Sequence, residues 1–460
     1  MNHSNRYNIK KTCLICLLSV FTGVSCEKYL SIKPDKKLAV PAHADDLYAM
    51  LDYVPVMNYN FSAAALSEVG SDNLFIPGPA WNSITSEENR STYVWGKIPV
   101  ENVYWNWPYM KIAVANTVLD LIEDVHFDNT SQISEITGMA KFFRGYVFYE
   151  LTQVFCAFYD DSSADDKLGI VLRLSSDINI PSVRSTLRET YDQIIADLSE
   201  SARLLPATKP RYPTRPYKAS AYAALARCFL SIGAYDRALA YADSCLALQN
   251  ELMDFNEIDV QQSYPFERFN REVIFYSQQG GSGGMLSENT ARIDTALFAS
   301  YAADDLRKLA YFKQMPDGYQ AFTGDFSQKT NMEKFNGLTT AEVLLIRAEV
   351  HARKGSLESA KNDLSKLMKA RYSTDRSDEI FNMEQAEIMA LVLNERRKEL
   401  VFRGIRWSDL RRLTHEGSIA VTLTRRIDKD LYTLSPEEIG AFAYLIPMQV
   451  IERSGIDQNK

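Results

Sequence analysis

The feature that most constrains the fold is a helical pair that occurs twice in the sequence. Residues 226–246 (ARCFLSIGAYDRALAYADSCL) and 348–368 (AEVHARKGSLESAKNDLSKLM) keep their apolar positions in step. Gly233 in the first segment matches Gly355 in the second. Because glycine accepts backbone conformations that other residues resist, it permits a tight turn between two helices. The shared pattern therefore predicts two equivalent helix–turn–helix units.

A small residue follows each glycine at the same distance, Ala238 in the first unit and Ala360 in the second. An alanine on the second helix lets the two helices of a pair approach closely, which is typical of tetratricopeptide repeats. Two unrelated helical hairpins are the alternative, but the common register favours the repeat. We therefore expect both alanines to be buried at close helix crossings.

Apolar residues recur at helical spacing in several other stretches. The expected helices are 44–53, 107–125, 132–156, 187–204, 217–232, 235–248, 339–354, 357–370 and 384–403. Two regions, 54–100 and 251–337, lack this period and are rich in polar and aromatic residues, so we expect an irregular second layer there. We predict a mainly α fold with one domain over 44–460, whose helical repeats lie within 107–250 and 338–413.

The N-terminus has the form of an export signal. Basic residues precede a short apolar stretch at 13–21, and Gly-Val-Ser leads into Cys26. The stretch is too short to span a bilayer but is typical of a signal peptide. Small residues before a cysteine resemble a bacterial lipobox, although an ordinary secretory signal is the alternative. We predict a signal peptide over 1–25, lipidation of Cys26 and a tether over 26–43.

Composition and motifs exclude several other classes of function. The formal net charge is -8, which disfavours nucleic acid as a partner. The sequence contains no Walker loop, GxGxxG, GxSxG or HExxH motif, and its five histidines lack metal-ligand spacing. We predict no catalytic residue, no metal and no cofactor. The acidic residues within 160–166 leave a calcium site open, but a solvated loop is favoured.

Three cysteines remain after the predicted signal and anchor: Cys156, Cys228 and Cys245. Each lies in an apolar helical stretch, where a buried free thiol is the favoured interpretation. A bridge between Cys228 and Cys245 is left open, because spacing alone does not decide it.

Several segments resemble the SusD/RagB family. They are WNWPYMKIAVANTVLDLI (105–122), KFFRGYVFYELTQVF (141–155), LNERRKELVFRGIRWSDLRRL (393–413) and YLIPMQVIERSGIDQN (444–459). The third is similar to the family's C-terminal signature almost residue for residue. The last departs from the family pattern at Leu445 and Ser454, which leaves the course of the C-terminal tail open.

The resemblance implies a scaffold of about four tetratricopeptide-like pairs with an irregular ligand-binding layer. It implies a lipid-anchored protein of the outer membrane and cell surface that takes up nutrients. Such a protein captures oligosaccharide and delivers it to a partner TonB-dependent β-barrel transporter of the SusC-like type. A peptide-binding member of the family and a periplasmic tetratricopeptide scaffold are the alternatives. A polysaccharide-cleaving enzyme has no support in the sequence.

Charged residues gather in the signature segment, with Glu395, Glu399 and Arg403 at helical spacing. They are expected to lie along one helix face and to pair there. We interpret them as a structural network that joins this helix to the repeats. Trp407 is expected to cover this network.

Sugar rings stack on flat aromatic side chains, while Asp, Asn and Arg bind hydroxyl groups. Trp95, Trp105 and Trp107 are expected to be packing residues, because their neighbours are apolar or helical. Trp81 lies in a polar GPAWNS segment and is the predicted stacking platform for a neutral oligosaccharide. The predicted ligand-binding residues are Asp72, Asn73, Trp81 and Arg90.

Overall fold

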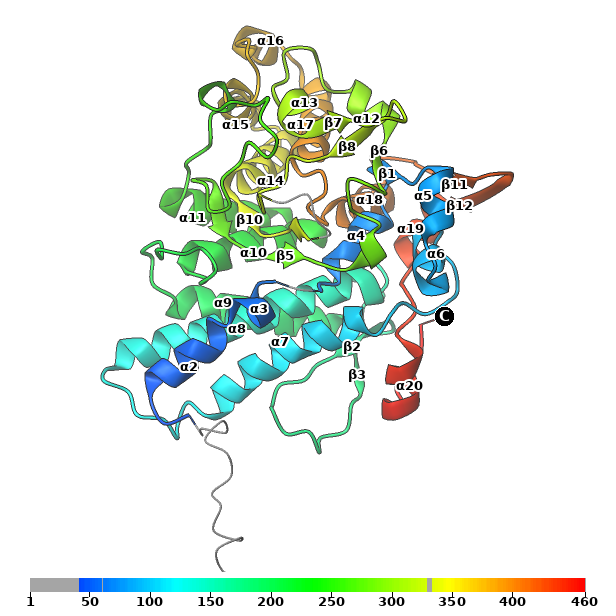
Figure 1. Ribbon diagram of the computed structural model, residues 1–460. Coiled ribbons are helices and arrows are strands. Elements are labelled where there is room, and N and C mark those ends of the chain that lie inside the picture. Colours follow the sequence, from blue (N-terminus) through cyan, green and yellow to red (C-terminus); the bar gives the residue numbers. More distant parts are fainter. Residues whose placement is uncertain (1–40, 60, 329–332, 460) are drawn as a thin grey trace, which may run out of the picture. The chain divides into compact units, whose positions relative to one another are not determined.

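The computed structural model describes residues 41–59, 61–328 and 333–459 (Figure 1). The chain divides into two units, Met1–His43 and Ala44–Lys460. The predicted signal peptide, Cys26 and most of the predicted tether lie outside the described residues. All the helices and strands given below belong to the second unit.

Long amphipathic or buried helices form the scaffold of this unit (Figure 1). They are α7 (Val103–Asp120), α8 (Thr130–Phe155), α9 (Leu187–Leu204), α10 (Lys218–Ser231), α11 (Tyr235–Leu248), α14 (Thr340–Arg353), α15 (Leu357–Lys369), α17 (Gln385–Glu399) and α18 (Arg406–His415). Neighbours along the chain pack side by side: α8 contacts α7 and α9, α10 contacts α9 and α11, and α14 contacts α11, α15 and α17. The prediction of a mainly α repeat scaffold is confirmed.

The two predicted helix pairs are α10–α11 and α14–α15. Their turn glycines, Gly233 and Gly355, have φ angles of +71° and +75°, the left-handed region that glycine enters without strain. Ala238 and Ala360 are both fully buried on the second helix of their pair. The sequence pattern thus predicted both the turns and the close contacts.

Replacing Ala238 or Ala360 with leucine should overpack these helix contacts. We expect each variant to lose about 1–3 kcal/mol of unfolding free energy, because a packed interface has no room for extra methyl groups. Urea unfolding followed by circular dichroism measures the loss. Ala240→Leu is the matched control, since Ala240 is exposed on the same helix as Ala238. An equal effect of Ala238→Leu and Ala240→Leu would contradict the close-contact interpretation.

The predicted helix over 384–403 is wrong at its C-terminal end. Helix α17 ends at Glu399, and a turn with positive φ at Phe402 (+60°) and Gly404 (+70°) separates it from α18. Arg403 therefore lies outside the helix and does not pair with Glu399. Its guanidinium carbon instead lies 4.0 Å from the ring centre of Phe326 and 4.4 Å from that of Phe335.

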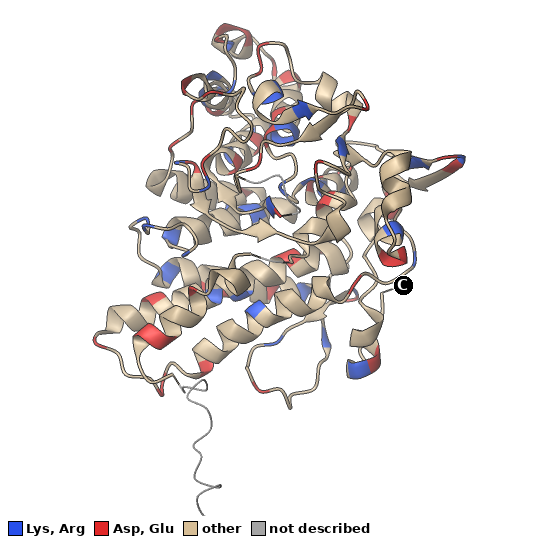
Figure 2. Ribbon diagram, viewed as in Figure 1, with Lys and Arg blue, Asp and Glu red and all other residues tan. Residues whose placement is uncertain are grey.

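The other charged residues of the signature do form a buried structural network. Arg396 pairs with Asp409, while Glu395 and Glu399 pair with Arg307. Trp407 is fully buried and packs against Phe442 and Tyr444. On the ribbon as a whole, acidic and basic residues are interspersed rather than segregated (Figure 2). These contacts confirm the structural interpretation of this segment.

The regions between the long helices contain short elements, as the loss of helical period predicted. The short helices are α2 (Ala44–Leu51), α3 (Val54–Met57), α4 (Ala64–Val69), α5 (Gly78–Ser83), α6 (Glu87–Tyr93), η1 (Phe255–Glu257), η2 (Ser282–Gly284), α12 (Thr295–Ala299), α13 (Arg307–Ala310), α16 (Ser377–Phe381), α19 (Pro436–Ala441) and α20 (Met448–Ser454).

The strands of the described residues pair two by two, always antiparallel. The pairs are β1 (Leu74–Phe75) with β6 (Arg292–Ile293), β4 (Val273–Phe275) with β10 (Leu338–Thr339), β2 (Leu168–Val171) with β3 (Arg184–Thr186), β5 (Gln278–Gln279) with β9 (Lys334–Phe335), β7 (Phe312–Gln314) with β8 (Gln320–Phe322), and β11 (Leu423–Ile427) with β12 (Asp430–Leu434).

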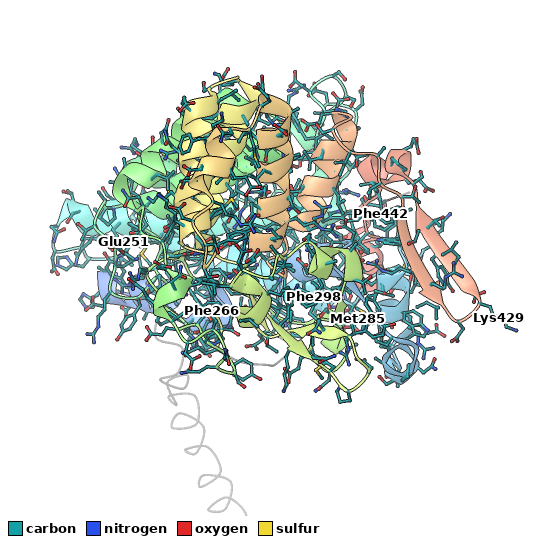
Figure 3. The ribbon with its side chains drawn as sticks, turned by 90° about the horizontal axis from the view of Figure 1, so that it is seen from above. Glu251, Phe266, Met285, Phe298, Lys429 and Phe442 are labelled. Atoms are coloured by element: carbon teal, nitrogen blue, oxygen red, sulfur yellow. The ribbon has the colours of Figure 1, made fainter. Side chains whose placement is uncertain are left out.

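These short elements gather beside the helices and build a second layer. Figure 3 shows Phe266, Met285 and Phe298 of this layer on one side of α14, α15 and α17. The hairpin β11–β12 projects away from the helices, with Lys429 at its outer end (Figure 3). Among the described residues, no helix is both long and apolar enough to cross a membrane.

The C-terminal tail is fixed by two amide side chains. Gln458 donates to the carbonyl oxygen of Ile446 (2.7 Å) and accepts from the backbone N–H of the same residue (2.8 Å). Asn459 donates to the carbonyl oxygens of Tyr444 and Phe155. The tail thus packs against α8 despite its departures from the family pattern.

Candidate ligand-binding face

A short strand pair brings together two segments that are far apart in the sequence. In β1–β6, Leu74 lies opposite Ile293 and Phe75 lies opposite Arg292. Arg292 in turn pairs with Asp317 at 2.8 Å, in the turn of the β7–β8 hairpin. This ion pair holds the hairpin turn against β1.

An aromatic ledge results from this arrangement. The ring of Tyr319 meets the ring of Phe75 edge-on, with centroids 5.0 Å apart and planes at 84°. Tyr319 is 44% exposed and Phe75 is partly buried, so the edge contact leaves tyrosine surface open to solvent. The turn that carries Tyr319 has Gly318 at φ +84°, which a residue with a side chain would resist.

Trp81 lies on α5, which begins three residues after β1. Its ring is half-buried, 5.6 Å from that of Tyr93 and tilted by 46°. The guanidinium carbon of Arg90 lies 5.7 Å from the centre of the Trp81 ring. Pro77 and Pro79 fix the backbone at the start of this helix, which limits the freedom of the tryptophan. The structure thus brings together two of the four predicted ligand-binding residues.

The other two predicted residues have internal partners. Asp72 forms a bidentate ion pair with Arg406, at 2.7 and 2.9 Å, and lies 3.2 Å from Arg397. Burial opposes ionisation, but the two guanidinium groups lower the pKa of Asp72 to about 2. The Asp72 carboxylate therefore fastens this face to α17 and α18.

Asn73 is almost completely buried. Its amide donates to Glu68 at 2.8 Å and its side-chain oxygen accepts from Arg397. Glu68 also accepts from the backbone N–H groups of Phe402 and Gly404. Burial raises the pKa of Glu68 to about 7, although these donors oppose the rise. In this structure Asp72 and Asn73 position the face, while their contact with ligand stays a prediction.

The structure adds two residues that the sequence did not single out as site residues, Phe75 and Tyr319. Tyr319 belongs to an aromatic-rich stretch, but Tyr311, Phe312 and Phe322 of the same stretch are buried. Sequence offers one signal that distinguishes them, namely Gly318, which marks a turn and therefore an exposed neighbour. Trp95 and Trp105 are buried, as expected of packing residues.

The remaining cysteines and the acidic loop, which the sequence left open as candidate sites, are buried or engaged in structural contacts. Cys156, Cys228 and Cys245 are buried free thiols, so the possible bridge between Cys228 and Cys245 is absent. In the acidic loop, Arg188 pairs with Asp161 and Asp165. Within the described ranges, no three His, Cys, Asp or Glu side chains gather in a way that suits a metal ion.

The arrangement suits recognition of a flat, hydroxyl-rich ligand. Aromatic faces favour the C–H faces of sugars, and an arginine beside them offers hydrogen-bond donors. The Nε of Arg90 is itself buried and has no hydrogen-bond partner among the described residues, so ligand would meet the other guanidinium nitrogens. The chain combines helical repeats with an irregular layer that carries an exposed aromatic ledge. This is the architecture of a helical-repeat binding protein.

Comparison with known proteins identifies the family. Residues 28–230 match the family described as "Starch-binding associating with outer membrane", and residues 312–440 match the SusD family. The chain belongs to the SusD/RagB family. A comparison with curated proteins found no match.

Solved structures share the fold. A SusD superfamily protein from Bacteroides thetaiotaomicron is 20% identical, with a TM-score of 0.73, over 91% of this chain and 100% of that chain. A putative sugar binding protein from Bacteroides vulgatus is 19% identical, with a TM-score of 0.72, over 92% and 99%. A laminarin binding SusD-like protein is 18% identical, with a TM-score of 0.64, over 91% and 99%.

Proposed function

We propose that this protein binds neutral oligosaccharide at the cell surface and delivers it to a TonB-dependent β-barrel transporter. The observation that carries this proposal is the aromatic ledge, in which Tyr319 is held edge-on to Phe75. The pair of Trp81 on α5, which begins three residues after β1, and Arg90 on α6 extends the face. The face therefore draws on β1, α5, α6 and the β7–β8 turn. Binding without catalysis fits a face that offers stacking surfaces and hydrogen-bond donors.

Family membership and the names of similar structures support the choice of ligand. One relative is a laminarin binding protein and another a putative sugar binding protein. The proposed route to the membrane rests on the N-terminal sequence, in which a signal peptide leads into Cys26. Lipid on Cys26 would tether the second unit to the outer membrane, beside its transporter partner.

Removing the ledge should weaken glycan binding without unfolding the protein. We expect Tyr319→Ala and Trp81→Ala each to lower affinity for a neutral oligosaccharide about tenfold, since 1.4 kcal/mol of lost stacking corresponds to that factor. Titration calorimetry against a panel of neutral glycans and peptides measures the change. Tyr319 is the safer variant, because its exposed ring contributes little to the core.

Tyr53→Ala is the matched control for this experiment. Tyr53 is 57% exposed and lies before α3, outside the ledge. Its replacement should leave glycan affinity unchanged. Unaltered glycan binding by both ledge variants would remove the ledge from the site. Tight binding of peptides with no glycan binding would overturn the proposed ligand class in favour of a peptide-binding member of the family.

A further inference from the structure

A second concave site lies away from the aromatic ledge. Its volume is about 740 Å³. It is lined by Asp52, Val54, Tyr59 and Glu135, by most residues of the segment 206–217 between α9 and α10, and by Arg268 and Phe269. Figure 1 places α3, at its edge, well to the left of α5, which carries Trp81. The sequence did not predict this pocket, because its walls come from four segments that are far apart in the sequence.

One wall of the pocket is rigid although it has no regular secondary structure. Residues 206–217 contain four prolines, each of which fixes its φ angle. The backbone of this segment is anchored at three points. Lys218 donates to the carbonyl oxygen of Pro206, Tyr276 donates to that of Pro213, and the side chain of Asn58 donates to that of Thr214. A wall that is ordered in advance lowers the entropic cost of binding a ligand.

The mouth of the pocket carries exposed aromatic rings. Tyr212 is 51% exposed and Phe269 is 38% exposed, and their ring centroids lie 6.2 Å apart at 62°. Buried aromatic residues stabilise a core, but these two leave much of their surface in water. They offer faces on which a sugar ring can stack.

The pocket also holds three cations without a close ion-pair partner among the described residues. Lys209, Arg211 and Arg268 form no ion pair within 4 Å in the part of the chain that the structure describes. Arg211 lies over the Tyr212 ring at 5.1 Å, and Arg268 donates to the hydroxyl of Tyr59 at 3.0 Å.

The two acidic residues of the lining are already engaged. Asp52 accepts from Arg215 at 2.7 Å, and Glu135 accepts from the hydroxyl of Tyr48 at 3.0 Å. The lining holds four cations, Lys209, Arg211, Arg215 and Arg268, against the two carboxylates of Asp52 and Glu135, so its net charge is positive. Guanidinium groups bind carboxylates in a two-point geometry, which gives this pocket a preference for planar anions.

We propose that this pocket is a second carbohydrate site, which takes a sugar ring that carries a carboxylate, such as a uronate unit of an acidic oligosaccharide. Tyr212 stacks on the ring, and Arg211 and Arg268 bind the carboxylate. The site stands apart from the ledge, for which a neutral glycan is proposed. The two proposals can therefore be tested independently of each other.

The test compares a trisaccharide of galacturonic acid with the neutral galactose trisaccharide of the same linkage. Titration calorimetry with the wild-type protein should show at least about tenfold tighter binding of the acidic sugar, which weakens as salt screens the charges. Tyr212→Ala should lower the affinity for the acidic sugar about tenfold. The double variant Arg211→Gln, Arg268→Gln should remove the preference for acid over neutral sugar.

Arg237→Gln is the matched control. Arg237 is an exposed arginine stacked on Phe229 at 4.1 Å, as Arg211 is on Tyr212, but it lies outside the pocket. It should leave acidic-sugar binding unchanged, and so should Tyr319→Ala. Equal affinity for the two trisaccharides, or full acidic-sugar binding by the double variant, would overturn the proposal. Loss of acidic-sugar binding in Tyr319→Ala alone would assign that ligand to the ledge instead.

Discussion

Replacing Arg307 with methionine is expected to lower the free energy of unfolding by about 3–5 kcal/mol, because it leaves buried carboxylates without their counter-charge. Arg307 is completely buried and pairs with Asp305, Glu395 and Glu399. Methionine keeps much of the side-chain volume, so the loss reports on charge rather than on a cavity.

The size of this effect follows from the rest of the cluster. Arg371 neutralises Glu272 and Glu399, and Lys398 neutralises Asp305 and Glu395. Each of those cations is already shared between two carboxylates, so neither can replace Arg307 without leaving another acid unpaired. The cluster joins α13, α17 and the segment after α15. Its disruption would therefore weaken the contact between the long helices and the second layer.

Urea unfolding followed by circular dichroism measures the change. Arg376→Met is the matched control, because Arg376 binds Asp304 at 2.6 Å in the neighbouring segment but both side chains are partly exposed. A surface pair of this kind contributes about 0–1 kcal/mol. Equal losses in the two variants would contradict a special role for the buried cluster.

Cys26→Ser is expected to release the protein from membranes. Each buried methylene of an acyl chain contributes about 0.8 kcal/mol, so the loss of the lipid removes most of the binding free energy. Membrane fractionation with immunoblotting measures the distribution, and mass spectrometry of the mature N-terminus detects the lipid. Surface labelling of intact cells separates a cell-surface protein from a periplasmic scaffold.

Cys13→Ser is the control, because Cys13 lies in the same predicted signal peptide but is removed on cleavage. That variant should stay on the membrane. Retention of Cys26→Ser at the wild-type level would rule out the lipid anchor.

The helical scaffold follows from local sequence. Helix α9 spans Leu187–Leu204, as predicted, since Thr186 and Glu189 form a capping box at its start. The turns at Gly233 and Gly355 and the burial of Ala238 and Ala360 were likewise predictable. These features depend on residues three or four positions apart, and that spacing is visible in a single chain.

Only the tertiary structure decided which polar and aromatic side chains are free to meet a ligand. Asp72 has a side chain of the type that binds sugar hydroxyls, yet Arg397 and Arg406 engage its carboxylate. Tyr319 resembles its buried neighbours, yet its turn leaves it exposed beside Phe75. Exposure and pairing are set by segments hundreds of positions away, so no local pattern records them. The sequence by itself determined the repeat scaffold, while the packing of distant segments decided where its binding surfaces lie.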